Sequence, residues 1–201
     1  MNDLHHDIYH LDDEQPAPQA GSLLVAKPTV PDDVFARSVI IIISNHDEEG
    51  AMGLIANRIT NFTVADVLDA VPRGSSIPVY LGGPVGLDTF FFLHTLGPDV
   101  IPGAGVVAPG LFIGGDFDAV KRYLASGAPV DGRIKFFVGY SGWGEHQLDD
   151  EIERHDWAVV RHWDLDTVMS ADFDTMWSLT VRRLGPRYRL WLDMPLDPQL
   201  N

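Results

Sequence analysis

The chain of 201 residues contains no cysteine. This absence excludes disulfides, thiol nucleophiles and thiolate zinc sites, so any metal would have to bind histidine and carboxylate side chains. Long apolar runs are also missing. The longest run, from Val39 to Ile43, is far shorter than the roughly 20 residues that a membrane-spanning helix needs. The sequence therefore predicts a protein that does not enter a membrane.

Basic residues are scarce, with 14 Lys and Arg against 29 Asp and Glu and a formal net charge of −15. Phosphate contacts depend on Lys and Arg, so this charge disfavours direct binding to nucleic acid or to an anionic membrane surface. A small molecule or a protein of unknown identity is the expected partner. The local exception is a basic cluster of Arg182, Arg183, Arg187 and Arg189. We interpret it as the cationic end of a helix, with a phosphate site as the alternative.

The N-terminal segment lacks the basic start and apolar centre of a signal peptide, which favours a cytoplasmic protein. Residues 1–20 are acidic and contain prolines, a composition typical of a disordered arm. We expect one domain over residues 21–191 and a short tail over residues 192–201.

Several apolar segments separated by turn residues predict strands, and they alternate irregularly with helices. Val39 to Ile43 is so uniformly apolar that both of its faces should be covered. Asp116 is a plausible N-cap for a helix from Phe117 to Ala125, and a second helix is expected from about Asp172 to Leu184. The passage at residues 97–110 suggests little regular structure. This irregular order favours a mixed sheet in a single α/β or α+β domain.

The segment Gly-Tyr-Ser-Gly-Trp-Gly, residues 139–144, is expected to form a turn between a strand and an acidic helix. Free N–H groups at such a turn can bind phosphate or carboxylate. The segment has neither the GxGxxG spacing nor a following lysine, and acidic residues open the next helix. We therefore favour a structural role, with Trp143 as an anchor, over a ligand role.

Other candidate positions lie at strand ends. Gly82 and Gly83 predict a tight turn, with a pocket wall as the alternative. Asn57 could connect two loops through its amide. His46 and His94 could join carboxylates in a metal site, but no short spacing supports one, and we predict neither a metal nor a cofactor. Gln147 and Glu151 lie four residues apart and share one helix face.

Taken in order, the segments of the chain resemble one family, the YqgE/AlgH proteins, over nearly all of residues 21–191. The matching segments are GSLLVAKPTVPDDVFARSVIIIISNHDEEGAMGLIANR, VYLGGPV, FFFLH, FIGGDFDAV, FFVGYSGWGEHQLDDEIERHDW and DTMWSLTVRRLG. The resemblance implies a mixed α/β fold with a partly rolled sheet and a role in regulating transcription, through a link to alginate synthesis. It implies no catalytic residues.

We hypothesise that the loops carrying the recurring residues converge on one ligand-binding cleft. These residues are Asn57, Gly82, Gly83, His94, Gly139, Ser141, Gly142, Trp143, Gln147 and Glu151. The favoured function is a regulatory binding module that affects transcription indirectly, through a small ligand or a protein partner. The alternative is a hydrolase-like or metal-assisted enzyme around Ser141, His94 and Glu151.

Overall fold

A computed structural model describes residues 15–46, 48–68 and 76–194. Within these residues, ten strands form one mixed sheet: eight follow the order β10-β1-β2-β3-β9-β6-β8-β7, β5 also pairs with β9, and β4 pairs with β5. The strands are β1 (Leu23–Ala26), β2 (Val39–His46), β3 (Gly50–Ile55), β4 (Ile59–Thr63), β5 (Pro78–Leu81), β6 (Val85–His94), β7 (Gly105–Ala108), β8 (Leu111–Ile113), β9 (Ile134–Trp143) and β10 (Trp157–Val160). Only the pairing of β5 with β9 is parallel among the described strand pairs. The predicted α/β domain with a mixed sheet is confirmed.

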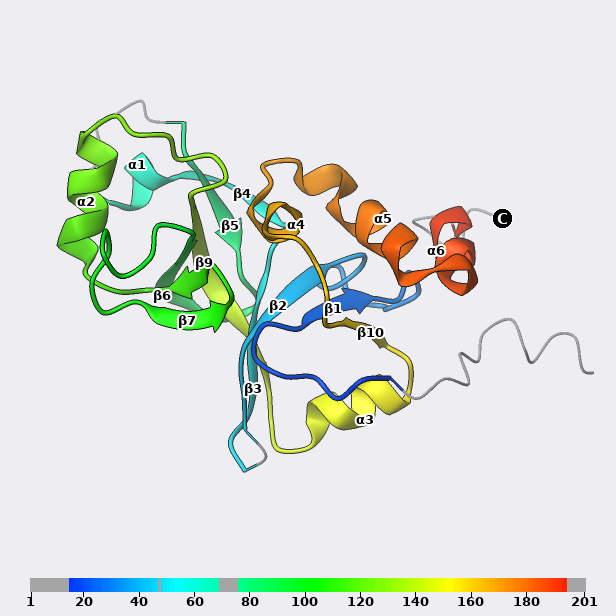
Figure 1. Ribbon diagram of the computed structural model, residues 1–201. Helices are drawn as coiled ribbons and strands as arrows, with labels where there is room; N and C mark the ends of the chain where they lie inside the picture. Colours follow the sequence, from blue (N-terminus) through cyan, green and yellow to red (C-terminus); the bar gives the residue numbers. More distant parts are fainter. Residues whose placement is uncertain (1–14, 47, 69–75, 195–201) are drawn as a thin grey trace, which may run out of the picture.

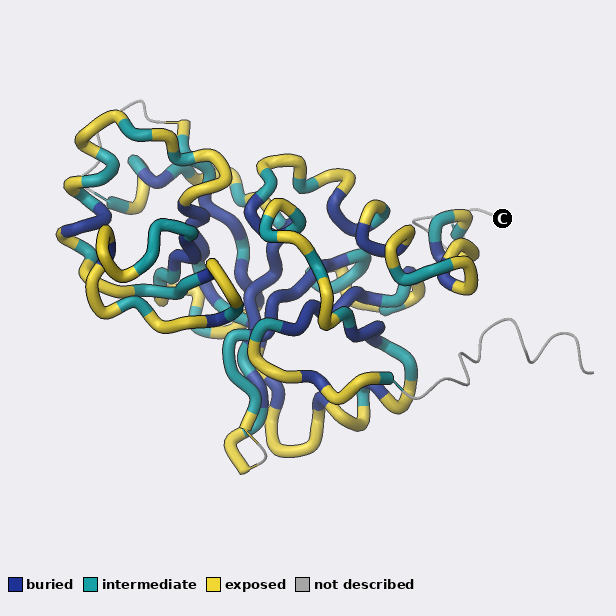
Figure 2. The backbone as a smooth tube through the Cα atoms, in the orientation of Figure 1, coloured by how far each residue is buried: buried dark blue, intermediate teal, exposed yellow. Residues whose placement is uncertain are grey.

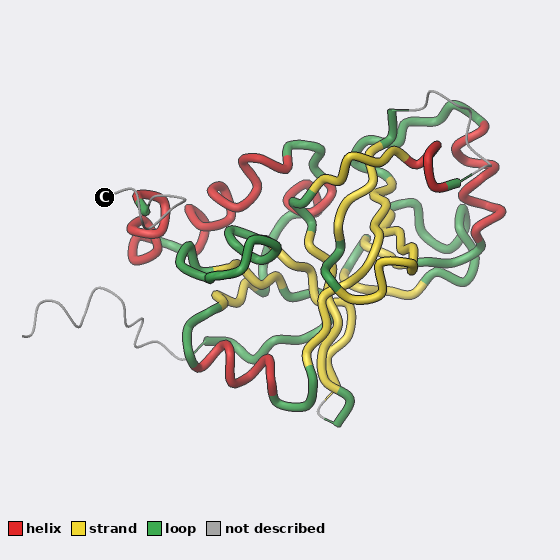
Figure 3. The backbone as a smooth tube through the Cα atoms, turned by 180° about the vertical axis from the view of Figure 1, so that it is seen from behind, coloured by secondary structure: helices red, strands yellow, loops and turns green. Residues whose placement is uncertain are grey.

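The helices lie around the periphery of this sheet (Figure 3). They are α1 (Val64–Val67), α2 (Phe117–Ala125), α3 (Gln147–Glu153), α4 (Leu165–Met169), α5 (Phe173–Leu184) and α6 (Arg189–Asp193), with a 3-10 turn at Pro186–Tyr188. In Figure 1, α1 and α2 lie at one end of the molecule and α5 and α6 at the other. None of the described helices is long and apolar enough to cross a bilayer.

Strand β2 is buried on both faces, as its apolar sequence predicts. Val39 and Ile41 face one core, which includes Val168 of α4 and Val181 of α5. Ile40 and Ile42 face a second core with Leu148 and Ile152 of α3. Helices α5 and α3 therefore cover opposite faces of this part of the sheet. Figure 2 shows the resulting buried band along the central strands.

The helix starts follow the capping signals in the sequence. Asp116 accepts a hydrogen bond from the Asp118 N–H and begins α2, and Asp172 accepts one from the Thr175 N–H at the start of α5. A third core gathers α1 and α2 against β5, β6 and β9. The expected lack of regular structure at residues 97–110 is wrong in one part, because Gly105–Ala108 pairs with β8 as strand β7.

The expected turn at residues 139–144 is also wrong, because β9 continues through it to Trp143. Gly139 adopts a φ of +67° within the strand, at the point where the register between β6 and β9 shifts. Beyond it, Ser141 and Trp143 are buried and pair with Gly53 and Ala51 of β3. Pairing with β3 therefore overrides the turn preference of the glycines.

The expected arm and tail lie partly outside the described residues, at 1–14 and 195–201. Residues 15–20 run along β10: the Gln15 side chain accepts from the Val159 N–H at 3.1 Å and donates to the Tyr188 hydroxyl at 2.9 Å. At the other end, Leu192 and Asp193 belong to α6. The boundaries at residues 20 and 191 stay predictions.

Candidate functional site

Four of the predicted site residues form a close backbone junction between β9 and the end of β5. A Cβ atom added to Gly82 would lie 2.3 Å from the Gly139 carbonyl oxygen, and one on Gly83 would lie 2.3 Å from the Tyr140 carbonyl. Such separations are far inside van der Waals contact, so only glycine fits. The fully buried Ser141 hydroxyl donates to the Gly82 carbonyl at 3.0 Å. The backbone after β5 and the backbone of β9 are therefore in direct contact at this junction.

Glu151 on α3 accepts three hydrogen bonds from side chains. Its Oε2 accepts from the indole N–H of Trp143 at 2.9 Å and of Trp157 at 2.7 Å. Its Oε1 accepts from the Gln147 amide at 2.9 Å. The Gln147 Oε1 in turn accepts from the Gly144 N–H at 3.0 Å. This carboxylate holds α3 against the end of β9, and the expected anchoring role of Trp143 is supported.

Asn57 and Gly142 also have structural contacts. The Asn57 side chain is buried, accepts from the Val39 N–H at 2.8 Å and donates to the Arg37 carbonyl at 3.0 Å. It therefore connects the start of β2 to the preceding loop, which is the role its sequence position suggests. Gly142 pairs with Met52 in the β3–β9 ladder.

His94 lies in the last position of β6, fully buried between the rings of Phe92 and Phe112. Its Nε2 donates to the Gly114 carbonyl at 3.1 Å, because a carbonyl oxygen can only accept. The Nδ1 atom has no hydrogen-bond partner among the described residues. Burial lowers the pKa of His94, so the neutral ring is favoured.

The side chains of the enzyme alternative therefore have separate partners: Gly82 for Ser141, Gly114 for His94, and two indoles with Gln147 for Glu151. No group of three or more histidine, aspartate or glutamate side chains in the described parts of the chain is arranged to hold a metal. The shared cleft and the enzyme alternative stay predictions.

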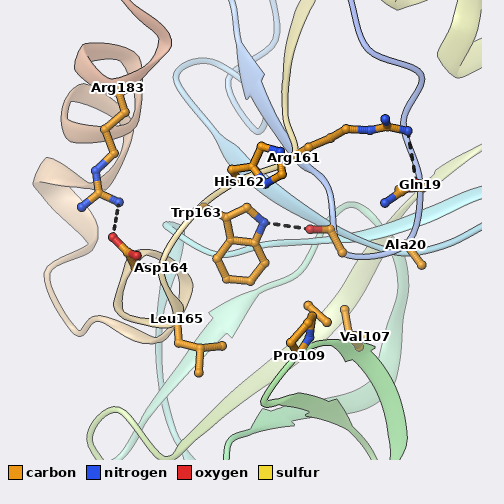
Figure 4. A pocket seen from close by; sticks show the side chains of 12 residues that line it. Gln19, Ala20, Val107, Pro109, Arg161, His162, Trp163, Asp164, Leu165 and Arg183 are labelled. Carbon is orange, nitrogen blue, oxygen red and sulfur yellow. Dashed lines mark hydrogen bonds and ion pairs between the residues drawn. The ribbon is translucent and has the colours of Figure 1, made fainter.

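A pocket of about 620 Å³ lies elsewhere, and none of the ten predicted residues lines it. We call it the Trp163 pocket. It is formed by residues 19–21 before β1, residues 107–109 at the end of β7, residues 161–165 from the end of β10 to the start of α4, and Arg183 of α5 (Figure 4). Its volume lies within the 300–1,000 Å³ range of small-molecule sites.

Hydrogen bonds fix the walls of the Trp163 pocket. The Trp163 indole N–H donates to the Gly21 carbonyl at 2.8 Å. Arg161 donates to the Gln19 side-chain oxygen at 3.1 Å. Arg183 donates to the Thr167 hydroxyl at 2.7 Å and lies 3.4 Å from an Asp164 carboxylate oxygen. The pocket thus combines a fixed aromatic ring with two guanidinium groups.

Sequence reasoning missed most of this pocket because the segment WAVVRHW, residues 157–163, predicts one continuous strand. Strand β10 ends at Val160, so Arg161 to Asp164 form a polar and aromatic loop. A run of such residues directly after a buried strand is the signal that could have identified the loop. The basic cluster did include Arg183, but its members separate: Arg182 and Arg189 line a different surface pocket.

Sequence reasoning also missed Lys135, a lysine of β9 that is only 4% exposed. Its ammonium donates to the carbonyls of Ala56, Val168 and Ser170 at 2.8, 2.9 and 3.0 Å. It also lies 4.1 Å from the centre of the Tyr80 ring. Burial lowers the pKa of Lys135 to about 7. Lys135 connects β9 to the end of β3 and to the C-terminus of α4.

Comparison with known proteins gives consistent results over almost the whole chain. A family model described as AlgH-like matches residues 23–189. A UPF0301 protein from Parabacteroides distasonis is 42% identical over 194 residues, covering 96% of this chain and 97% of the relative. A UPF0301 protein from Bacteroides fragilis is 38% identical over 195 residues, covering 97% of each.

Two solved structures share the fold. The solution structure of the AlgH protein from Pseudomonas aeruginosa has a TM-score of 0.67 and 26% identity, covering 91% of this chain and 98% of that one. The crystal structure of a protein from Corynebacterium diphtheriae has a TM-score of 0.72 and 24% identity, covering 89% and 94%.

Proposed function

The chain belongs to the AlgH-like family, and from this membership we propose that it is a cytoplasmic binding module that regulates transcription indirectly, through a small ligand held in the Trp163 pocket. In this proposal, ligand binding changes how the protein binds a partner protein. The protein does not itself bind DNA.

The observation that carries the proposal is the construction of the pocket. Four segments from different parts of the sequence meet there, and side chains from each of them line one hollow (Figure 4). Trp163 is held by the Gly21 carbonyl, so its ring is already ordered before a ligand arrives. A site that needs little ordering loses less binding free energy to entropy.

The net charge of −15 supports an indirect route to transcription. A protein that contacts several phosphates must bring several cations to one face, and this chain has an excess of 15 acidic groups. A gel mobility-shift assay at low salt tests this part. We expect no tight, sequence-selective binding, and finding it would contradict the indirect route.

The ligand part of the proposal can be tested by a thermal-shift screen of metabolites on the full chain. A ligand that binds only the folded state raises the melting temperature. The indole N–H signals of the five tryptophans in an NMR spectrum report where the ligand binds. A ligand in the pocket should shift the Trp163 signal most.

A matched pair of variants tests whether the ligand binds in the Trp163 pocket. Ala20 lines the pocket and is exposed, so Ala20→Trp should fill the space and abolish the thermal shift. Ala17 is exposed in the same segment but does not line the pocket, so Ala17→Trp should leave the shift unchanged. If no metabolite binds, or if every hit survives Ala20→Trp, the proposal is wrong.

A further inference from the structure

The walls of the Trp163 pocket are locally cationic in an acidic protein. Arg161 and Arg183 both line it, together with His162, and Asp164 is the only carboxylate in its described lining. Elsewhere acidic residues outnumber basic ones by about two to one. An excess of guanidinium groups at one hollow in such a chain favours an anion there, because the rest of the surface repels it.

Arg161 has donors to spare. Among the described residues Arg161 donates a single hydrogen bond, from Nη2 to the Gln19 side-chain oxygen, whereas a guanidinium carries five N–H donors in a planar fork. The residue is exposed, so the remaining donors are accessible. This fork matches the two oxygens of a carboxylate or phosphate.

Arg183 is paired, but its pair is weak enough to exchange. The Asp164 carboxylate lies 3.4 Å from Nη1, and the two side chains are 54% and 79% exposed. An ion pair this exposed contributes about 0 to 1 kcal/mol, so an incoming anion can replace Asp164 at little cost. The hydrogen bond to the Thr167 hydroxyl keeps the guanidinium in place.

Trp163 lies between the two arginines (Figure 4). Its N–H is already bound to Gly21, so the ring contributes its face and not its donor to a ligand. A flat aromatic surface favours another planar ring stacked on it. Val107 and Pro109 supply apolar contact on the wall formed at the end of β7.

We propose that the Trp163 pocket binds a small planar dianion: a ring stacked on Trp163, with acidic groups reaching Arg161 on one side and Arg183 on the other. This proposal rests on the proposed ligand-binding function and names the ligand's chemical class. The acidic groups are carboxylates or phosphates, and the pocket volume of about 620 Å³ suits a molecule of mononucleotide size.

The test uses a probe series that adds charge to one ring: adenosine, AMP and adenosine 3′,5′-bisphosphate, with inorganic phosphate alone and terephthalate as the carboxylate probe. Affinity for the full chain is measured by calorimetry, and the Trp163 indole signal is followed by NMR. We expect affinity to rise from adenosine to the bisphosphate by at least a hundredfold. A stronger response to terephthalate than to the nucleotides would identify carboxylates as the acidic groups.

Three variants distinguish direct contacts of the two pocket arginines with the ligand from a general effect of losing one positive charge. Arg161→Gln and Arg183→Gln should each weaken the binding of the best dianion at least tenfold and leave adenosine unaffected. Arg122→Gln is the matched control, because Arg122 is also an exposed arginine (70%) at 3.5 Å from a carboxylate, on α2. It removes the same charge and should change affinity less than twofold.

Each failure has a distinct meaning. If adenosine binds as tightly as its phosphates, or if Arg122→Gln weakens binding as much as the pocket variants, the dianion proposal is wrong. If none of the probes binds at millimolar concentration, the dianion proposal is wrong, but a neutral metabolite that moves the Trp163 signal would leave the proposed function standing. If no metabolite of any charge moves that signal, both proposals fail.

Discussion

Two charged side chains in this fold are each held by three hydrogen bonds, and they are held in different ways. Lys135 donates to three main-chain carbonyls at the boundary of β9, β3 and α4. Glu151 accepts from three side chains, two indoles and one amide, between α3 and β9. Lys135 is 4% exposed, whereas Glu151 is only partly buried.

The difference lies in what remains when the charged group is removed. Main-chain carbonyls cannot rotate away, so the partners of Lys135 would stay buried without a donor. The exposed Gln147 amide can turn, and water can reach the partly buried Glu151 site. The Lys135 contact is therefore the more costly one to break, and it stabilises the arrangement of the strands themselves.

The largest expected effect is on Lys135→Met, which keeps the length of the side chain but removes its donors. The carbonyls of Ala56, Val168 and Ser170 lose a partner, and we expect the free energy of unfolding to fall by about 3 kcal/mol. Urea denaturation measures this. Lys121→Met is the control: Lys121 is a partly exposed lysine paired with Asp118 on α2, and its loss should cost less than about 1 kcal/mol.

A loss below about 1 kcal/mol for Lys135→Met would contradict the comparison. It would mean that the three carbonyls find other donors, and that Lys135 is no more structural than an exposed lysine.

The second effect is a pH dependence that belongs to Lys135. Burial lowers its pKa from 10.5 to about 7 in the folded protein. Between these values the unfolded chain binds the proton more fully than the folded chain, so this group makes the free energy of unfolding rise with pH. From pH 7 to pH 9 we expect the wild type to gain about 2 kcal/mol relative to Lys135→Met.

Urea denaturation of both proteins at the two pH values isolates this contribution, because the other titrating groups are common to both. Parallel pH profiles for wild type and Lys135→Met would show that the three carbonyls hold the ammonium protonated, against the effect of burial.

A smaller effect is expected for Glu151→Ala. It leaves the indole donors of Trp143 and Trp157 without their acceptor, but the site is only partly buried and water can replace the carboxylate. We expect a loss of about 1.5 kcal/mol and a changed tryptophan fluorescence spectrum. Glu153→Ala, at an exposed position of the same helix, should change neither. Equal effects of the two variants would show that the Glu151 carboxylate stabilises the fold no more than an exposed glutamate does.

These two sites also show how much of the structure can be predicted from the sequence. Apolar runs and capping residues follow local rules, so the buried strand β2 and the starts of α2 and α5 could be predicted. The Glu151 partners could be suspected, since Gln147 lies one helical turn away and Trp143 was already an expected anchor.

The Lys135 partners could not be predicted, because backbone carbonyls carry no residue identity that a sequence pattern could reveal. The only signal is a lone charge in the apolar strand Ile-Lys-Phe-Phe. The same limit applies to the Trp163 pocket, whose walls come from four segments that meet only in the folded chain. The glycines at residues 139–144 misled the prediction for a related reason, since β3, distant in sequence, pairs with residues 141–143 and keeps them in a strand.

The smallest effect is expected for Ser141→Ala. This variant removes a buried hydrogen bond whose acceptor still receives a hydrogen bond from a second donor. The Gly82 carbonyl accepts from Ser141 at 3.0 Å and also from the Ile55 N–H at 2.9 Å. Removing the hydroxyl therefore leaves the carbonyl bonded, and the free energy of unfolding should fall by less than about 1 kcal/mol. Ligand binding in the Trp163 pocket should be unchanged, because Ser141 does not line it. Loss of a biochemical activity with this stability intact would instead favour Ser141 as a nucleophile and revive the enzyme alternative.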